Sequence, residues 1–167
     1  LKYRISIVTG GPGTGKTTCL RAIMDVYHKV WPSEHILLMA PTGLAAKRMA
    51  ESTGMNSATI HKACGLVPAD NPSGFKAQGE CRICGFVGID EMSMVGEHLF
   101  AFAVDAVLNS PSTRIVLLGD TDQLAPVSRG DVLRDLIECG VIKTGRGVPL
   151  PLRTHPSKSA RTVRIPA

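Results

Sequence analysis

The stretch Gly10-Gly11-Pro12-Gly13-Thr14-Gly15-Lys16-Thr17 decides the fold of this chain. It satisfies the pattern G-x-x-x-x-G-K-[ST] at every specified position, between a β-branched run at residues 5–8 and apolar residues with helical spacing over residues 18–30. Glycine lets successive backbone N–H groups turn toward a bound anion, and the positive end of the following helix points to the same place. The stretch predicts a phosphate-binding loop. A chance match is the alternative, and it would not explain the flanking strand and helix.

Contacts to a nucleoside triphosphate are expected along this loop and at the residue after it. Lys16 supplies a mobile positive charge for the β and γ phosphates, so it is a candidate catalytic residue, and the Thr17 hydroxyl is placed to ligate Mg²⁺. The predicted nucleotide-binding residues are Gly11, Pro12, Gly13, Thr14, Gly15, Lys16, Thr17 and Thr18.

Length and composition are those of one folded α/β domain. The chain has 167 residues, of which 44% are hydrophobic, and it lacks both an apolar run of about 18 residues and a signal-peptide pattern. We therefore expect a cytoplasmic protein without a membrane segment. The net charge of +5 is weak evidence for DNA binding, because residues 1–138 hold 13 Lys and Arg against 14 Asp and Glu. Five cysteines without a secretion signal favour reduced thiols.

The rest of the chain alternates between strand-like and helix-like segments. Residues 35–40, 85–89 and 114–118 read as buried strands, and helices are predicted over residues 44–52 and 97–108. Together with the phosphate loop, this alternation predicts an α/β fold of the P-loop NTPase class, with helices on both faces of a doubly wound, mostly parallel sheet in three layers. Residues 65–79 are rich in Gly, Pro and Asn and are expected to form an irregular excursion.

Polar residues follow the third and fourth predicted strands, at the sheet edge where ligands bind in open α/β folds. Asp90 is expected to hold Mg²⁺, and Glu91 to orient or deprotonate the attacking water. Gln123 could sense the γ-phosphate through its amide N–H₂ group. The alternative for Asp90 and Glu91 is a solvated acidic pair without a catalytic role.

Taken together, the segments resemble the first RecA-like motor domain of superfamily 1 helicases. The resemblance is to the RecD-like branch, which includes the exonuclease V alpha subunit and conjugative relaxase-helicases. Pif1-like relatives share part of the pattern but usually lack the G-x-V-L-x-D-L-I continuation. The matching segments are TGGPGTGKTT (motif I), APTGLAAKRMAESTG (motif Ia), SATIHKACGL, IDEMSMV (motif II) and LLGDTDQLAPVSRGDVLRDLI (motif III and its helix), within residues 5–138.

This resemblance implies an ATP-driven motor that moves 5′ to 3′ on single-stranded DNA. By position, Lys16, Glu91 and Gln123 are the implied catalytic residues, and Thr17 and Asp90 the implied Mg²⁺ ligands. Contact with single-stranded DNA would be mainly through its sugar-phosphate backbone. The implied DNA-side residues are Pro41, Thr42, Gly43, Thr59 and His61. From residues alone, the turn at 41–43 is also compatible with an ordinary strand-to-helix connection, and a lone His is more often structural.

Three features depart from the family pattern. The usual adenine-contacting segment would lie before Leu1. Cys64, Cys81 and Cys84 include one C-x-x-C pair, which supplies two of the four ligands that a structural zinc site needs. Residues 139–167 contain no Asp or Glu. They are expected to be a disordered tail, the out-of-frame end of a longer gene, or a basic DNA-binding segment.

We therefore expect a helicase ATPase domain over residues 1–138 and an atypical basic tail over residues 139–167. The second RecA-like domain, which contributes an arginine to phosphoryl transfer, would be absent from the chain. The predicted behaviour is Mg-ATP binding, slow hydrolysis and no autonomous unwinding, with a larger helicase–nuclease complex as a possible setting for DNA repair or recombination. A nucleotide-gated regulatory module is the alternative. A P-loop kinase would have no use for the segments around Gln123 and Thr42.

Overall fold

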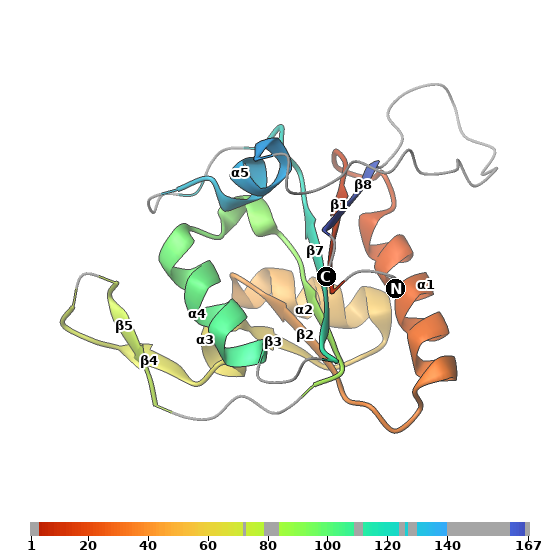
Figure 1. The fold of residues 1–167 in the computed structure, drawn as a ribbon, viewed down its shortest axis with the longest axis horizontal. Coiled ribbons are helices and arrows are strands. Elements are labelled where there is room, and N and C mark those ends of the chain that lie inside the picture. Colours follow the sequence, from red (N-terminus) through yellow and green to blue (C-terminus); the bar gives the residue numbers. More distant parts are fainter. Residues whose placement is uncertain are drawn as a thin grey trace.

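The computed structural model describes residues 4–71, 73–78, 84–108, 112–123, 126 and 130–139, and the backbone of residues 161–165. Strands and helices alternate along most of this length (Figure 1). In chain order the elements are β1 (Ile5–Thr9), α1 (Lys16–Val30), β2 (Ile36–Ala40), α2 (Gly43–Thr53), β3 (Ser57–Thr59), α3 (Ile60–Ala63), β4 (Leu66–Pro68), β5 (Phe75–Ala77), β6 (Phe86–Ile89), the 3-10 helix η1 (Met92–Met94), α4 (Glu97–Val107), β7 (Arg114–Gly119), α5 (Val132–Glu138) and β8 (Arg161–Ile165).

The main sheet has the strand order β3-β2-β6-β7-β1-β8. All neighbouring pairs are parallel except β1 with β8, which is antiparallel. The mostly parallel P-loop NTPase sheet predicted from the sequence is therefore confirmed. The phosphate loop follows β1, the acidic pair follows β6, and β7 lies between these two strands, so three polar segments reach the same edge of the sheet.

Successive residues of each central strand point to opposite faces of the sheet and enter different cores. Val8, Leu38, Phe86 and Leu118 pack with α1 and α2 on one face. Their chain neighbours Ile7, Met39, Val87 and Leu117 pack with α3, α4 and α5 on the other. Figure 1 shows α1 and α4 on opposite sides of the sheet. Burial on both faces explains why these strands read as continuous apolar runs.

Local sequence signals set the bounds of the helices. The Thr42 hydroxyl accepts a hydrogen bond from the Ala45 amide at 3.2 Å and so caps α2, which ends where Gly54 adopts a left-handed conformation with φ 74°. The predicted helix over residues 44–52 is observed with one further residue at each end. The predicted helices at residues 18–30 and 97–108 are confirmed with similarly small shifts.

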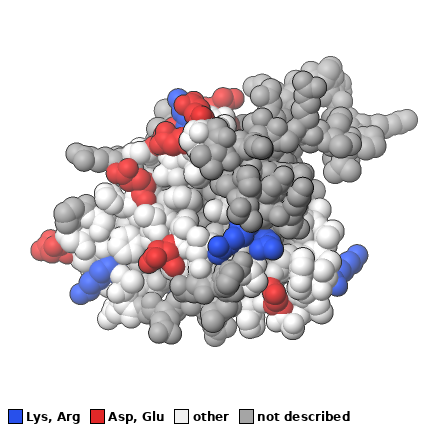
Figure 2. Space-filling model, in the orientation of Figure 1, with Lys and Arg blue, Asp and Glu red and all other residues white. Residues whose placement is uncertain are grey.

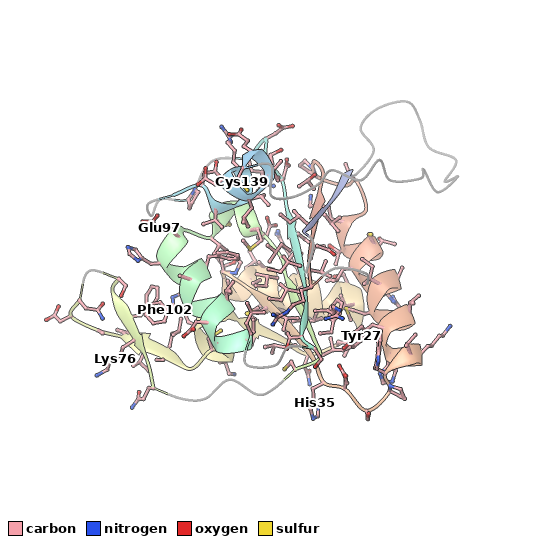
Figure 3. The ribbon with its side chains drawn as sticks, viewed as in Figure 1. Tyr27, His35, Lys76, Glu97, Phe102 and Cys139 are labelled. Atoms are coloured by element: carbon pink, nitrogen blue, oxygen red, sulfur yellow. The ribbon has the colours of Figure 1, made fainter. Side chains whose placement is uncertain are left out.

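The excursion over residues 65–79 is more regular than predicted. It contains the antiparallel hairpin β4–β5, with Leu66 paired to Ala77. Phe75 anchors the hairpin, because its ring centroid lies 5.4 Å from His61 and 5.2 Å from Phe102 in edge-on arrangements. Figure 3 shows Phe102 on the face of α4 that is turned toward the hairpin. Strands of three residues are too short to show a clear alternation of apolar and polar residues, so the sequence did not predict this hairpin.

One part of the predicted basic tail is described by the structure. Arg161–Ile165 form β8 beside β1, with Arg161 in register with Thr9. The remainder of the predicted tail beyond Cys139 lies outside the described residues, so the division at residue 138 stays a prediction. In the part of the chain that the structure describes, no helix is both long and apolar enough to cross a membrane.

Candidate nucleotide site

The loop between β1 and α1 is folded around its glycines. Gly13 and Gly15 have φ values of 70° and 85°, in the left-handed region that a side chain would make costly. The Thr14 hydroxyl donates a 2.8 Å hydrogen bond to the Gly11 carbonyl oxygen, which tightens the turn. The first turn of α1 follows at once, with the Cys19 amide donating to the Gly15 carbonyl oxygen. These features give the loop the shape expected of a phosphate binder.

Lys16 lies within the curve of this loop. Its Nζ atom donates hydrogen bonds to the carbonyl oxygens of Gly10 at 2.6 Å and Gly11 at 3.0 Å. The ammonium group is therefore already placed over the loop, where an incoming phosphate would meet it.

A cavity of about 200 Å³ opens beside the first turn of α1. It brings together Thr17 from the loop and the two carboxylate residues Asp90 and Glu91 that follow β6. The other wall belongs to α2. The lining residues are Thr17, Ala45, Arg48, Met49, Ser52, Asp90 and Glu91.

Both carboxylates at the cavity have raised pKa values. For Asp90 the main cause is burial, opposed by the Glu91 amide, which donates to Asp90 Oδ1 at 2.8 Å, and by the positive charge of Lys16. For Glu91 burial is again the main cause of the raised pKa. The negative charge of Asp90 acts in the same direction, while Lys16 and Arg48 oppose it. The acidic pair is therefore a concentrated negative site that nearby cations partly compensate.

Glu91 also has an unusual backbone conformation, with φ 54°. It is the residue before η1, where the Met94 amide donates to the Glu91 carbonyl oxygen at 3.0 Å. Left-handed conformations of non-glycine residues are costly and occur where surrounding contacts determine them. The turn directs the chain from the acidic pair into a short, well-defined helix.

Gln123 is placed by the loop that follows β7. Asp120 is 3% exposed, and its Oδ1 accepts a hydrogen bond from the Asp122 amide at 3.0 Å. The backbone N–H of Gln123 donates to the Asp120 carbonyl oxygen at 3.3 Å. The side-chain oxygen of Gln123, Oε1, accepts from the Ser93 hydroxyl at 3.1 Å. Gln123 is exposed and does not line the cavity, so the structure connects it to the acidic pair through Ser93 rather than through shared walls.

The predicted DNA-side residues divide into two groups. Pro41, Thr42 and Gly43 follow β2, and Thr59 ends the neighbouring parallel strand β3, so these four lie at adjacent strand ends. Thr42 and Thr59 cap α2 and α3 through their hydroxyl oxygens. His61 lies on α3 with its ring against Phe75, which is a packing role within the fold.

Three residues near the site were not singled out from the sequence. Arg48 lines the cavity from α2, six residues after the cap at Thr42. Asp120 lies next to the phosphate loop, because a Cβ added at Gly11 would stand 4.0 Å from Asp120 Oδ2. Ser93 follows the acidic pair. Asp120 had a signal, since it begins the polar run after a predicted strand, whereas Arg48 and Ser93 became visible only through tertiary packing.

The zinc hypothesis gains no support from the described part of the chain. Cys64 and Cys84 are buried in the core on the α3–α4 face of the sheet, and Cys81 lies outside the described residues. Among the residues that the structure describes, no group of three or more His, Cys, Asp or Glu could hold a metal ion.

Comparison with known proteins agrees with this geometry. A family model described as an AAA domain matches residues 1–129. The chain is 39% identical over 129 residues to the ATP-dependent RecD2 DNA helicase of Deinococcus radiodurans, covering 77% of this chain and 17% of that protein. It is 37% identical over 160 residues to the RecBCD enzyme subunit RecD of Mycolicibacterium smegmatis, covering 83% of this chain and 28% of that protein. The chain thus spans less than a third of the length of these curated relatives.

Solved structures of Pif1 share the fold. A Bacteroides Pif1 in complex with ADP-AlF4 superposes with a TM-score of 0.52 at 21% identity, covering 82% of this chain and 33% of that one. A Bacteroides Pif1 bound to single-stranded DNA gives a TM-score of 0.51 at 21% identity, covering 85% and 33%. The family model, the relatives and the motifs agree, and the chain belongs to the AAA domain family as a RecD-like helicase motor domain.

Proposed function

We propose that these 167 residues form the ATP-binding and ATP-hydrolysing part of a RecD-like DNA helicase that moves 5′ to 3′ along single-stranded DNA. The observation that carries the proposal is the shared cavity, where the residue ending the phosphate loop, Thr17, meets Asp90 and Glu91. A P-loop and a carboxylate pair that converge from two strand ends are what hydrolysis of a nucleoside triphosphate requires.

The donor set of the cavity fits Mg²⁺. The Thr17 hydroxyl and the Asp90 carboxylate line the same small space and are hard oxygen ligands, which Mg²⁺ prefers. With the triphosphate bound, the ion would neutralise charge on the β and γ phosphates. We assign Thr17 and Asp90 to hold it.

The other residues have separate tasks in this proposal. Backbone N–H groups of Gly11 and of residues 13–18 bind the phosphates, and the ammonium of Lys16 turns from the loop carbonyls toward the β and γ phosphates. Glu91 orients and deprotonates the attacking water, for which burial and its raised pKa suit it. Gln123 contacts the γ-phosphate side of the site from the end of β7.

Single-stranded DNA would run past the ends of β2 and β3. Pro41, Thr42, Gly43, Thr59 and His61 are our candidates for this contact. Helix α2 begins at Gly43, and the backbone N–H groups of its first turn can donate hydrogen bonds to a phosphate group. Figure 2 shows Lys and Arg of the described residues at several separate places on the visible face.

We expect slow hydrolysis from these residues alone. An arginine supplied by a second domain raises the rate by roughly 10³- to 10⁵-fold in arginine-finger NTPases. We propose that such a domain lies outside these 167 residues, and that the protein acts in a larger cytoplasmic helicase–nuclease assembly. One relative is named as a subunit of the RecBCD enzyme.

The test is Mg²⁺-dependent ATP turnover by the 167-residue chain, with and without a single-stranded oligonucleotide of about 20 nucleotides. We expect slow turnover that DNA accelerates and that Lys16→Ala abolishes. Nucleotide-dependent affinity for a protein, with no effect of DNA, would instead favour a regulatory module. Efficient duplex unwinding by the chain alone would contradict the expected dependence on a second domain.

A further inference from the structure

The end of β7 and the helix η1 approach each other unusually closely at Gly119. A Cβ added at Gly119 would stand 2.5 Å from Leu133 Cδ2, 3.2 Å from Met92 Cβ and 3.4 Å from the Ser93 amide nitrogen. A side chain at this position would require Leu133 to shift. The close approach places Ser93 beside the strand whose continuation, four residues later, is Gln123.

Ser93 uses this position for a long-range hydrogen bond. Ser93 is only 4% exposed, and its hydroxyl donates a hydrogen bond to Gln123 Oε1 at 3.1 Å. A buried hydroxyl without a partner would cost free energy, so the bond favours one placement of the glutamine side chain. The backbone of Gln123 is fixed separately by its hydrogen bond to Asp120. The exposed residue Gln123 is thus held by one hydrogen bond through its backbone and one through its side chain.

The direction of this hydrogen bond decides what Gln123 can offer a ligand. A glutamine amide carries an acceptor oxygen on one side and two N–H donors on the other. When Oε1 accepts from Ser93, the donors are turned away from Ser93. A flipped amide would bring its oxygen toward negatively charged phosphate, which is unfavourable.

We propose that Ser93 is a positioning residue that fixes the Gln123 amide so that its N–H donors, and not its oxygen, face the γ-phosphate or the attacking water. Ser93 stands two residues after Glu91 in the same short turn, so the water-orienting carboxylate and the glutamine are joined through one rigid segment. The inference rests on the proposed ATP hydrolysis and adds a residue to that same site.

The proposal is tested by a double-mutant cycle in the 167-residue chain, with kcat and KM for Mg-ATP measured from phosphate release. We expect Ser93→Ala to lower kcat roughly tenfold, since small misplacements of a positioned group cost about that much or more. KM should stay within about twofold. The Ser93→Ala, Gln123→Ala double variant should be no slower than Gln123→Ala alone, because the two residues act as one unit.

The matched control is Thr113→Val. It removes another buried hydroxyl, which donates to the Cys84 carbonyl oxygen at 2.8 Å near the opposite edge of the sheet. We expect this variant to lose stability and keep kcat. If Ser93→Ala does not fold, Ser93→Cys replaces it, because the thiol has a similar volume and is a weak donor.

The outcomes separate two failures. Lys16-dependent turnover in the wild type, combined with an unchanged kcat in Ser93→Ala, would overturn the role of Ser93 and leave the proposed function standing. Additive losses in the double variant would overturn it as well. A wild-type chain without Lys16-dependent turnover would overturn both.

Discussion

The Nζ atom of Lys16 donates a 2.6 Å hydrogen bond to the carbonyl oxygen of Gly10, six residues earlier in the chain. A second bond to Gly11 holds the same ammonium group at 3.0 Å. The lysine therefore closes the loop that it is proposed to serve, and a triphosphate must exchange phosphate oxygens for these carbonyls. The exchange is favourable because the negatively charged phosphate oxygens attract the ammonium group more strongly than the neutral carbonyl oxygens do.

Replacing Lys16 tests this arrangement directly. Lys16→Ala should weaken Mg-ATP binding by roughly 10- to 150-fold, because it removes a charge-assisted contact of about 1.5–3 kcal/mol. Titration with a fluorescent ATP analogue measures the change. Lys47→Ala is the charge-matched control, since Lys47 is 75% exposed and pairs with Glu51 on the surface of α2. Equal affinities of the two variants would contradict the assigned role of Lys16.

The second prediction concerns Arg48, which shares the cavity with Glu91 and lowers the pKa of that carboxyl. Arg48→Ala removes the cation that α2 presents to the acidic pair. We expect roughly a threefold to tenfold loss of turnover from this change in local charge. The adjacent Lys47→Ala, on the exposed side of the helix, should leave turnover unchanged. Phosphate-release assays at saturating Mg-ATP compare the two variants, and equal rates would remove Arg48 from the site.

The third prediction follows from the raised pKa values of Asp90 and Glu91. Because each carboxyl binds its proton more tightly in the folded state than in the unfolded state, the folded state holds more protons between the ordinary pKa and the raised one. The free energy of unfolding therefore falls as pH rises through that window, which begins near the ordinary values of 3.8 and 4.5. At neutral pH the acidic pair destabilises the folded protein.

Glu91→Gln should accordingly raise the free energy of unfolding at pH 8 by more than at pH 4, while turnover falls by at least about 100-fold through loss of the general base. Urea unfolding at the two pH values, in the absence of Mg²⁺ and nucleotide, measures the stability difference. Glu51→Gln, on the exposed surface of α2, is the control and should show little difference between the two pH values. If Glu91→Gln changed the free energy of unfolding equally at pH 4 and pH 8, the expectation would be wrong.

A fourth prediction concerns the contact at Gly119. Gly119→Ala forces a Cβ to within 2.5 Å of Leu133 Cδ2, which we expect to cost about 1–3 kcal/mol of stability. Gly43→Ala is the matched control, because a Cβ there meets nothing within 4 Å and alanine favours the helix. Urea unfolding of both variants gives the difference. A Gly119→Ala protein as stable as the wild type would show that Leu133 can move aside without penalty.

The sequence was most informative where chemistry depends on fixed spacing along the chain. The phosphate loop needs its glycines, Lys16 and Thr17 in one order, and the rule that ligands lie beyond parallel strand ends predicts Asp90 at the same edge of the sheet. The structure brings Thr17 and Asp90 into one cavity. The roles proposed for them remain predictions for the experiments above.

Contacts that depend on packing could not be predicted in this way. Arg48 reaches the cavity because α2 packs against α1 and β2, opposite the acidic pair that follows β6. Ser93 meets Gln123 because η1 lies close to Gly119 at the end of β7. Neither contact has a repeating pattern in the sequence. The β4–β5 hairpin was missed for a related reason: three-residue strands are too short for alternation to show, and Phe75 holds them through rings distant in sequence.

The left-handed backbone of Glu91 restricts how this position could change during evolution. Glycine would relax the φ value of 54° but would remove the carboxylate, and β-branched residues would increase the strain. Stability and chemistry therefore favour different residues at this one position. A descendant that had lost the need to hydrolyse ATP would gain from glycine here, so the residue at position 91 would record whether selection for turnover persists in a lineage.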